Sequence, residues 1–169
     1  MGIFIRYYLP WISMFEKIKE NYEKVKGSAD PESYLCSVFL MCAEGEMDKM
    51  PLQFDFFSKG NIKSFIIDGE NVKEQVDESF NEAKKDIDKL ELDKVNVPFD
   101  EAFGMAKTAL QKHPDSIAKV IVIIQVRDNV VIWNISFITK GLYIFNMKVN
   151  AESGEVIRED YSSLMADVR

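Results

Sequence analysis

Apolar residues recur at steps of three and four along the first part of the chain. They form one side of a helix, and lysines and glutamates fill the other side: Trp11, Met14, Phe15, Ile18, Tyr22 and Val25. Pro10 suits the first turn of a helix, and Gly27 ends the pattern. The pattern therefore predicts an amphipathic helix over residues 10–26. Before Pro10 we expect a strand or an apolar extension packed on the fold.

Period-two patterns follow. Residues 34–42 are apolar on both faces, which is typical of a central strand. Residues 52–58 alternate between apolar and polar, and Lys59-Gly60-Asn61 has the composition of a hairpin turn. Residues 62–68 are then the returning strand.

After Asp68-Gly69 the pattern changes to a narrow apolar stripe on a highly charged background. Twelve acidic residues against five lysines lie between Asp68 and Glu101. The stripe consists of Val72, Val76, Phe80, Ala83, Ile87 and Leu90. We therefore predict an acidic connecting helix over residues 70–95, with its carboxylates in water. Weak calcium binding by the carboxylates near Asp86 and Asp88 is the alternative.

The second half repeats the order of the first. Pro98 opens a predicted helix that ends before Pro114, which cannot continue it. Strands are predicted at 118–126, 130–138, 142–150 and 155–161, separated by turn-forming residues.

These elements predict an α+β fold with helices packed on an antiparallel β-sheet. We divide the chain into an N-terminal helix-plus-strands unit (1–69), the acidic connecting helix (70–95) and a C-terminal unit (96–169). The segment Phe56 to Gly60 aligns with Phe137 to Gly141 at an offset of 81. An internal duplication and a chance similarity are equally compatible with so few identities.

Three motifs in residues 97–161 resemble the PepSY domain family. The first is the helix from Val97-Pro98-Phe99 to the turn His113-Pro114-Asp115, and the second is the strand Trp133-Asn134-Ile135-Ser136-Phe137. The third and most specific is the closing run 149–157, Val-Asn-Ala-Glu-Ser-Gly-Glu-Val-Ile. The resemblance implies a non-enzymatic PepSY/cystatin-like unit of one helix followed by strands. If the chain is a duplication, the first half is a degenerate second copy of that unit. Family members are linked with peptidase propeptides, peptidase inhibition and extracytoplasmic sensing.

Alternation places Trp133, Ile135 and Phe137 on one face of their strand, as core beneath the helices. The opposite face is less polar than a solvent-exposed face, since Ile132 and Ile138 flank Asn134 and Ser136. We expect something to cover it: the sheet of the other half, the acidic helix or a second subunit. The candidate binding residues are Trp133, Asn134 and Ser136.

The sequence offers little for catalysis. His113 is the only histidine, which excludes a multi-histidine metal site, and its place at a helix end favours a structural role. No phosphate-binding glycine loop and no nucleophile elbow is present. We predict a protein that is not an enzyme and uses no metal or cofactor.

The net charge and the cysteines bear on the partners and the cellular location of the protein. The net charge is −7 without a basic patch, so we expect no nucleic-acid partner. No apolar run is long enough for a transmembrane segment. The even spacing of Cys36 and Cys42 predicts that both lie on one face of their strand, where they cannot pair with each other while the strand is intact. Free thiols fit a reducing compartment. We predict a cytoplasmic protein, with membrane-surface association through the N-terminus as the alternative.

The resulting prediction is a non-catalytic binding protein that presents a sheet surface or groove to an unknown peptide or protein. Modulation of a peptidase follows from the PepSY resemblance alone. A small-molecule carrier or sensor is the second hypothesis, with a pocket between helix and sheet and with Asn134, Ser136, Asn146 or Cys36 as ligand contacts. A homo-oligomer is compatible with either.

Overall fold

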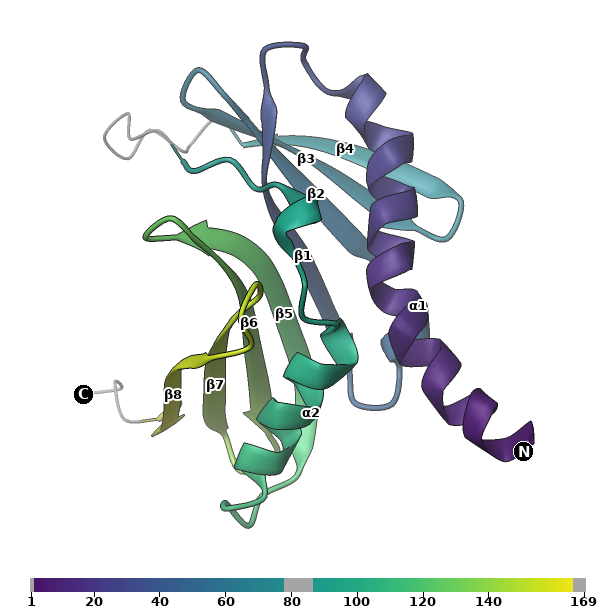
Figure 1. Cartoon of the computed structure of the whole chain (residues 1–169). Helices are drawn as coiled ribbons and strands as arrows, with labels where there is room; N and C mark the ends of the chain where they lie inside the picture. Colours follow the sequence, from purple (N-terminus) through teal and green to yellow (C-terminus); the bar gives the residue numbers. More distant parts are fainter. Residues whose placement is uncertain (1, 78–86, 166–169) are drawn as a thin grey trace.

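The computed structural model describes residues 2–77 and 87–165. It has two α-helices packed against one eight-stranded antiparallel β-sheet, so the fold is α+β and dominated by the sheet (Figure 1). The order along the chain is one helix and four strands, then again one helix and four strands.

The helices are α1 (Gly2–Val25) and α2 (Phe99–Leu110). The strands are β1 (Tyr34–Ala43), β2 (Leu52–Ser58), β3 (Asn61–Asp68), β4 (Asn71–Asp77), β5 (Ile117–Arg127), β6 (Val130–Thr139), β7 (Tyr143–Asn150) and β8 (Val156–Ser163). Both predicted strand-rich regions are confirmed, and so is the helix that Pro98 opens.

The two halves meet at the centre of the sheet. Its strand order is β4-β3-β2-β1-β5-β6-β7-β8, so the first strand of each half pairs with the other. The β1–β5 pairing is antiparallel and runs from Ser37 opposite Gln125 to Ala43 opposite Lys119. The first half therefore extends the sheet of the second instead of covering it.

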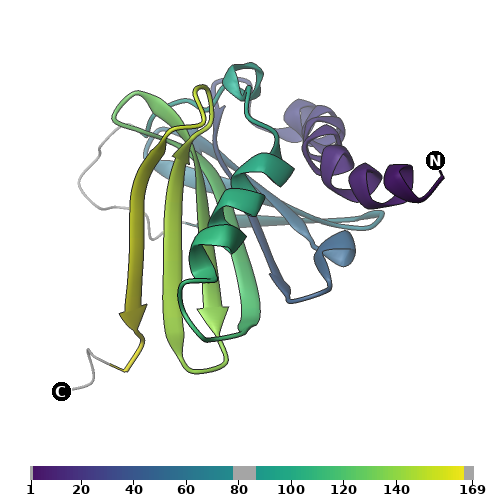
Figure 2. The same ribbon diagram turned by 60° about the horizontal axis from the view of Figure 1, so that its bottom comes forward.

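Both helices lie on the same face of the sheet, which we call the helix face (Figures 1 and 2). Aromatic rings connect them to the strands: Phe15 of α1 contacts Trp133, and Phe103 of α2 contacts Phe137. One continuous hydrophobic core includes residues from both helices and from β1, β2, β3, β5, β6 and β7. Burial of this apolar surface is the main stabilising term of the fold.

The acidic helix predicted over residues 70–95 is wrong in the part that the structure describes. Asn71–Asp77 forms strand β4, paired along its length with β3. Gly69, with φ of +61°, sits in the tight turn that joins them. Asp68-Gly69 is a strong hairpin signal, and pairing with β3 decides in favour of a strand. Phe80, Ala83 and Asp86 of the predicted stripe and carboxylate group lie outside the described residues.

Residues 90–97 are also not a helix. Apart from a short 3₁₀ turn at Leu92–Lys94 they run extended, with four side chains buried in the core: Leu90, Leu92, Val95 and Val97. The Leu90 amide donates to the Leu35 carbonyl, and the amides of Asn96 and Val97 donate to Ala151. This connection therefore contributes to the core that both halves share.

Helix α1 begins at Gly2, so the expectation of a strand or extension before Pro10 is wrong. Proline in a helix interior removes one backbone hydrogen bond and lowers stability, but it does not forbid helical residues before it. No helix among the described residues is long and apolar enough to span a bilayer.

Strand β1 contains a bulge that reverses one sequence-based prediction. The register with β2 shifts between Leu35 and Ser37, so Cys36 leaves the face that carries Val38 and Cys42. The predicted shared face for the two cysteines is therefore wrong. Both are free and buried, and burial is the main cause that raises the pKa of Cys36 to about 12 and of Cys42 to about 11.

Candidate functional site

The face of the sheet opposite the helices, the outer face, carries every second residue of each strand. On β5 the residues Val120, Val122 and Ile124 are fully buried toward the helices, so Ile121 and Ile123 point to the outer face and are half-buried. Directly opposite residues on neighbouring strands share a face. The outer face of the second half can therefore be followed from β5 to β8.

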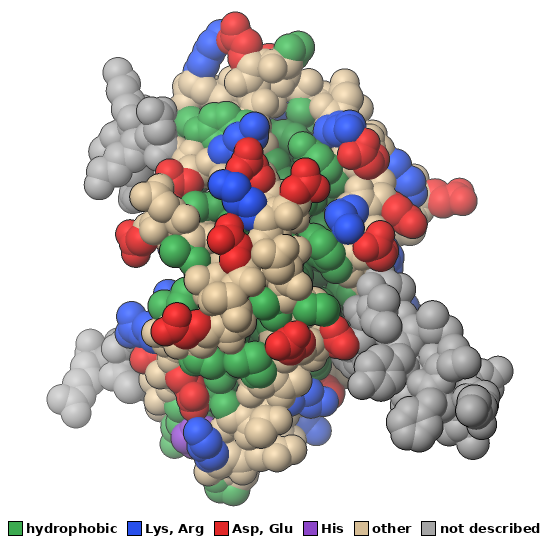
Figure 3. Space-filling model, viewed as in Figure 1, with side chains coloured by type: hydrophobic (Ala, Val, Ile, Leu, Met, Phe, Trp, Pro, Cys, Tyr) green, Lys and Arg blue, Asp and Glu red, His purple; other side chains and the backbone are tan. Residues whose placement is uncertain are grey.

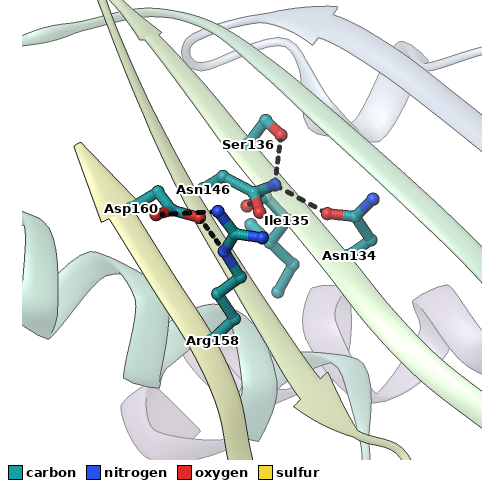
Figure 4. Close-up of polar contacts among 6 residues, drawn as sticks. All are labelled: Asn134, Ile135, Ser136, Asn146, Arg158 and Asp160. Atoms are coloured by element: carbon teal, nitrogen blue, oxygen red, sulfur yellow. Dashed lines mark hydrogen bonds and ion pairs between the residues drawn. The ribbon is translucent and has the colours of Figure 1, made fainter. Parts of the chain in front are cut away.

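Three side chains on this face form what we call the amide cluster: Asn134, Ser136 and Asn146. The Asn146 Nδ2 group donates to Asn134 Oδ1 at 2.6 Å and to Ser136 Oγ at 2.8 Å (Figure 4). Ser136 and Asn146 are directly opposite on β6 and β7. The structure thus brings together two of the three predicted binding residues and adds Asn146, which among the two hypotheses only the carrier hypothesis names as a ligand contact.

Hydrogen bonds fix the side chains of the amide cluster but do not use all of its donors and acceptors. Asn134 Nδ2 and Asn146 Oδ1 have no hydrogen-bond partner among the described residues. A free amide donor and a free amide acceptor on one surface match the hydrogen-bonding groups of a peptide backbone. The arrangement is therefore suited to binding a peptide group.

Trp133 is not part of this surface. Its side chain is 0% exposed and points to the helix face, where Nε1 donates to the Val97 carbonyl at 3.0 Å. Its ring packs edge-on against Phe15 and Phe99. Adjacent residues of a strand point to opposite faces, so Trp133 and Asn134 cannot act on one ligand. The expectation that Trp133 belongs to an exposed binding site is not supported by this geometry, although its core position agrees with the alternation.

Next to the amide cluster lie two basic residues, which we call the cation pair: Lys148 of β7 and Arg158 of β8. They are directly opposite each other, and Lys148 is directly opposite Asn134 on its other side. Arg158 Nε lies 2.5 Å from Asp160 Oδ2 (Figure 4). Lys148 has no carboxylate at ion-pair distance among the described residues.

The first half has a polar cluster at the equivalent place, centred on Asp55 of β2. The Asp55 carboxylate accepts hydrogen bonds from the hydroxyls of Ser37 and Ser64, each at 2.6 Å, and from Gln53 Nε2 at 2.9 Å. Asp55 and Ser64 are directly opposite on the second and third strands of their half, as Ser136 and Asn146 are. This cluster supplies its own partners.

The lone histidine has a structural environment. His113 follows α2 and stacks on Tyr161 of β8 with ring centroids 3.7 Å apart, and Tyr161 stacks in turn on Tyr143 at 5.0 Å. Nearby, the Asp115 carboxylate accepts hydrogen bonds from the amides of Ser116 and Gly141. Hydrogen bonds lower the pKa of Asp115, the largest contribution being that of the Thr139 hydroxyl and smaller ones those of these two amides.

Two hollows in the described part of the molecule lie beside the helices. One of about 320 Å³ lies between α1 and the start of α2, lined by Phe15, Glu16 and residues 95–100. Another of about 510 Å³ lies between α1 and residues 89–94 and has a mixed charged and apolar lining. Figure 3 shows this side, where acidic, basic and apolar side chains alternate. Asn134, Ser136 and Asn146 line neither hollow.

Among residues 2–77 and 87–165 no group of three or more histidine, cysteine, aspartate or glutamate side chains could hold a metal ion. One buried carboxylate oxygen, Asp100 Oδ1 at the start of α2, has no hydrogen-bond partner within that part.

Comparison with known proteins gives a fold and no family. No protein-family model and no curated protein matches the chain. The fold is similar to that of a solved bacterial protein. That protein is described as a putative lipoprotein from Clostridium difficile 630, with a TM-score of 0.57 over 86% of this chain and 90% of the other. At 15% sequence identity the similarity concerns the fold alone.

Proposed function

We propose that this protein is a binding protein that presents the outer face of its sheet to a protein or peptide partner. The amide cluster carries the proposal. Asn146 fixes the side chains of Asn134 and Ser136 on a face that neither helix covers, and one amide donor and one amide acceptor have no partner in residues 2–77 and 87–165. Half-buried Ile121 and Ile123 on the neighbouring strand add apolar surface. Such a mixture is typical of protein interfaces.

Selection of ligands on the intact protein tests this. Displayed twelve-residue peptides are selected on the wild-type protein, and their affinities are then measured for two outer-face variants, Ile123→Gln and Asn146→Ala. The control is Val72→Gln, which changes an exposed valine on β4. We expect about a tenfold loss for the outer-face variants and less than about a twofold change for the control. Equal affinities for all three variants would show that the outer face is not the site.

The peptidase hypothesis is a narrower proposal and is supported only by the PepSY resemblance of residues 97–161. It predicts inhibition or activation of some peptidase by the intact protein. Assays against serine, cysteine, aspartic and metallopeptidases would test it, and no effect on any class would remove it.

We also propose that the two halves descend from one duplicated unit. Three features support this: the repeated order of helix and four strands, the pairing of the two first strands, and the equivalent positions of the two polar clusters. The carrier hypothesis and the cytoplasmic location stay predictions. The carrier hypothesis loses its proposed polar contacts, since Asn134, Ser136 and Asn146 face away from the helices.

A further inference from the structure

The cation pair has a feature that folding alone does not favour. Like charges placed directly opposite on one face of a sheet lower stability, and Lys148 and Arg158 occupy such positions on β7 and β8. The Cβ atoms of directly opposite residues lie about 5 Å apart. The two basic groups therefore compete for the same counter-charge.

Carboxylates of the described residues supply little negative charge to Lys148 and Arg158. Asp160 contacts the Nε side of Arg158, with its second oxygen 3.4 Å from one terminal nitrogen, and leaves the rest of the guanidinium open. On the outer face of β5 to β8 the charged side chains are four basic and one acidic: Lys119, Arg127, Lys148, Arg158 and Asp160. That face is thus +3 by this count, in a chain of net charge −7.

The third group of the row is the unused amide donor. Asn134, Lys148 and Arg158 follow one another across β6, β7 and β8, and strands are spaced about 4.8 Å apart. All three present N–H groups that lack an acceptor among the described residues, apart from the Arg158–Asp160 contact. A row of donors with two positive charges is complementary to an anion with two acceptor oxygens.

We infer that Asn134, Lys148 and Arg158 form a carboxylate site, and that the partner of the outer face binds through an acidic segment. This inference rests on the proposed function and specifies its partner. The carboxylate lies between the two basic groups, and the adjoining apolar residue of the partner packs on Ile123, which is directly opposite Asn134. Because the site is open to water, the ionic contacts are weakened by salt.

The test uses the intact ¹⁵N-labelled protein and a hexapeptide in which two glutamates flank a leucine. Binding is followed by NMR through the Asn134 side-chain amide and the Arg158 Nε–H signals, with the glutamine version of the peptide as a control. We expect the glutamate peptide to bind about fivefold more tightly than the glutamine peptide, and the difference to shrink as salt is raised from 20 to 300 mM. Equal binding of the two peptides would overturn the inference.

Variants locate the site. Lys148→Gln and Arg158→Gln should each remove the preference for glutamate, and Arg158→Lys should keep part of it because the charge remains. Lys73→Gln is the matched control, because Lys73 is directly opposite Ile66 on the outer face of the first half. Loss of the preference in Lys73→Gln as well would assign it to general charge and overturn the site.

Three further outcomes distinguish the source of the anion, the carboxylate site and the proposed function. Inorganic phosphate that perturbs these signals where acetate does not would replace the carboxylate site by a phosphate site. If changes at Ile123 and Asn146 weaken binding of the selected peptides and changes at Lys148 and Arg158 do not, the proposed function stands and the carboxylate site is overturned. If glutamate binding needs the cation pair while selected peptides ignore Ile123, the site stands and the proposed function fails.

Discussion

The two halves of the sheet have polar clusters at equivalent positions, but the hydrogen bonding within the two clusters differs. In the first half Asp55 accepts three side-chain hydrogen bonds from Ser37, Gln53 and Ser64. In the second half Asn146 donates to Asn134 and Ser136, and the Asn134 Nδ2 donor, in the same row as Lys148 and Arg158, has no acceptor among the described residues. A closed cluster stabilises the fold, and an open one is available to a partner. This difference is the reason why we propose the outer face of the second half, and not that of the first, as the binding surface.

Beneath both clusters the helix faces of the two halves are matched. Leu52, Phe54 and Phe56 of β2 are buried as Trp133, Ile135 and Phe137 of β6 are. The two halves therefore have similar buried cores and different outer surfaces. This can be tested by changing equivalent positions in the two halves.

The largest effect is expected in the core. Trp133→Ala should lower the free energy of unfolding by about 3–5 kcal/mol, because it leaves a large cavity and removes the hydrogen bond to Val97. The equivalent change, Leu52→Ala, should cost about 2–5 kcal/mol. Urea unfolding measures both. A loss below 1 kcal/mol for Trp133→Ala would contradict its place in the core.

The polar clusters should separate stability from binding. Asp55→Ala leaves nearly buried Ser64 and two other donors without their acceptor, so we expect a loss of about 2 kcal/mol in unfolding free energy. Asn146→Ala should cost about 1 kcal/mol or less but weaken peptide binding. The same urea experiment and the peptide titration measure the two effects. A larger stability loss for Asn146→Ala than for Asp55→Ala would reverse the comparison.

A smaller effect of opposite sign is expected at the β6–β7 turn. Leu142 has φ of +62° and its side chain is 51% exposed, so it adopts a left-handed backbone without much burial in return. Leu142→Asn should therefore stabilise the protein by about 0.5–1 kcal/mol, since asparagine tolerates this conformation. Thermal unfolding measures it, and destabilisation would indicate that the Leu142 side chain has a packing role.

The smallest effect is a dependence on pH near the same turn. Hydrogen bonds from Thr139, Ser116 and Gly141 lower the pKa of Asp115 in the folded protein. The stability that this carboxylate adds is therefore present above its unfolded pKa of about 3.8 and is lost as pH falls through the lower folded value. Melting temperatures between pH 6 and 2.5 should fall less for Asp115→Asn than for the wild type in that acid range. Parallel curves would show that Asp115 contributes nothing.

Much of the fold could be predicted from periodicity, because the strands of the second half alternate regularly and are separated by turn residues. The closing motif is an example: Asn150 Oδ1 accepts the amides of Glu152 and Ser153, and Gly154 has φ of +82°. Local turn chemistry of this kind is visible in a sequence. Strand β4 was missed because its valines are four residues apart, which also fits a helix, and only pairing with β3 decides.

Only part of the candidate site can be predicted from the sequence. Asn134 and Ser136 stand out as polar residues between isoleucines on one strand, but Lys148 and Arg158 become neighbours only through the register of β7 and β8. Trp133 has the side-chain chemistry of a binding residue, but its alternation with Asn134 places it on the other face of the strand.

The pairing of β1 with β5 has a consequence for the route of folding. It joins residues 76 to 88 positions apart (43 with 119, 37 with 125), whereas the other strand pairs within each half are closed by short connections. Contacts between distant residues form late, because a long loop must first be closed. Until that step each half exposes an unpaired apolar strand at its edge. Two chains that meet in this state can exchange halves, so slow refolding at high concentration should yield a domain-swapped dimer.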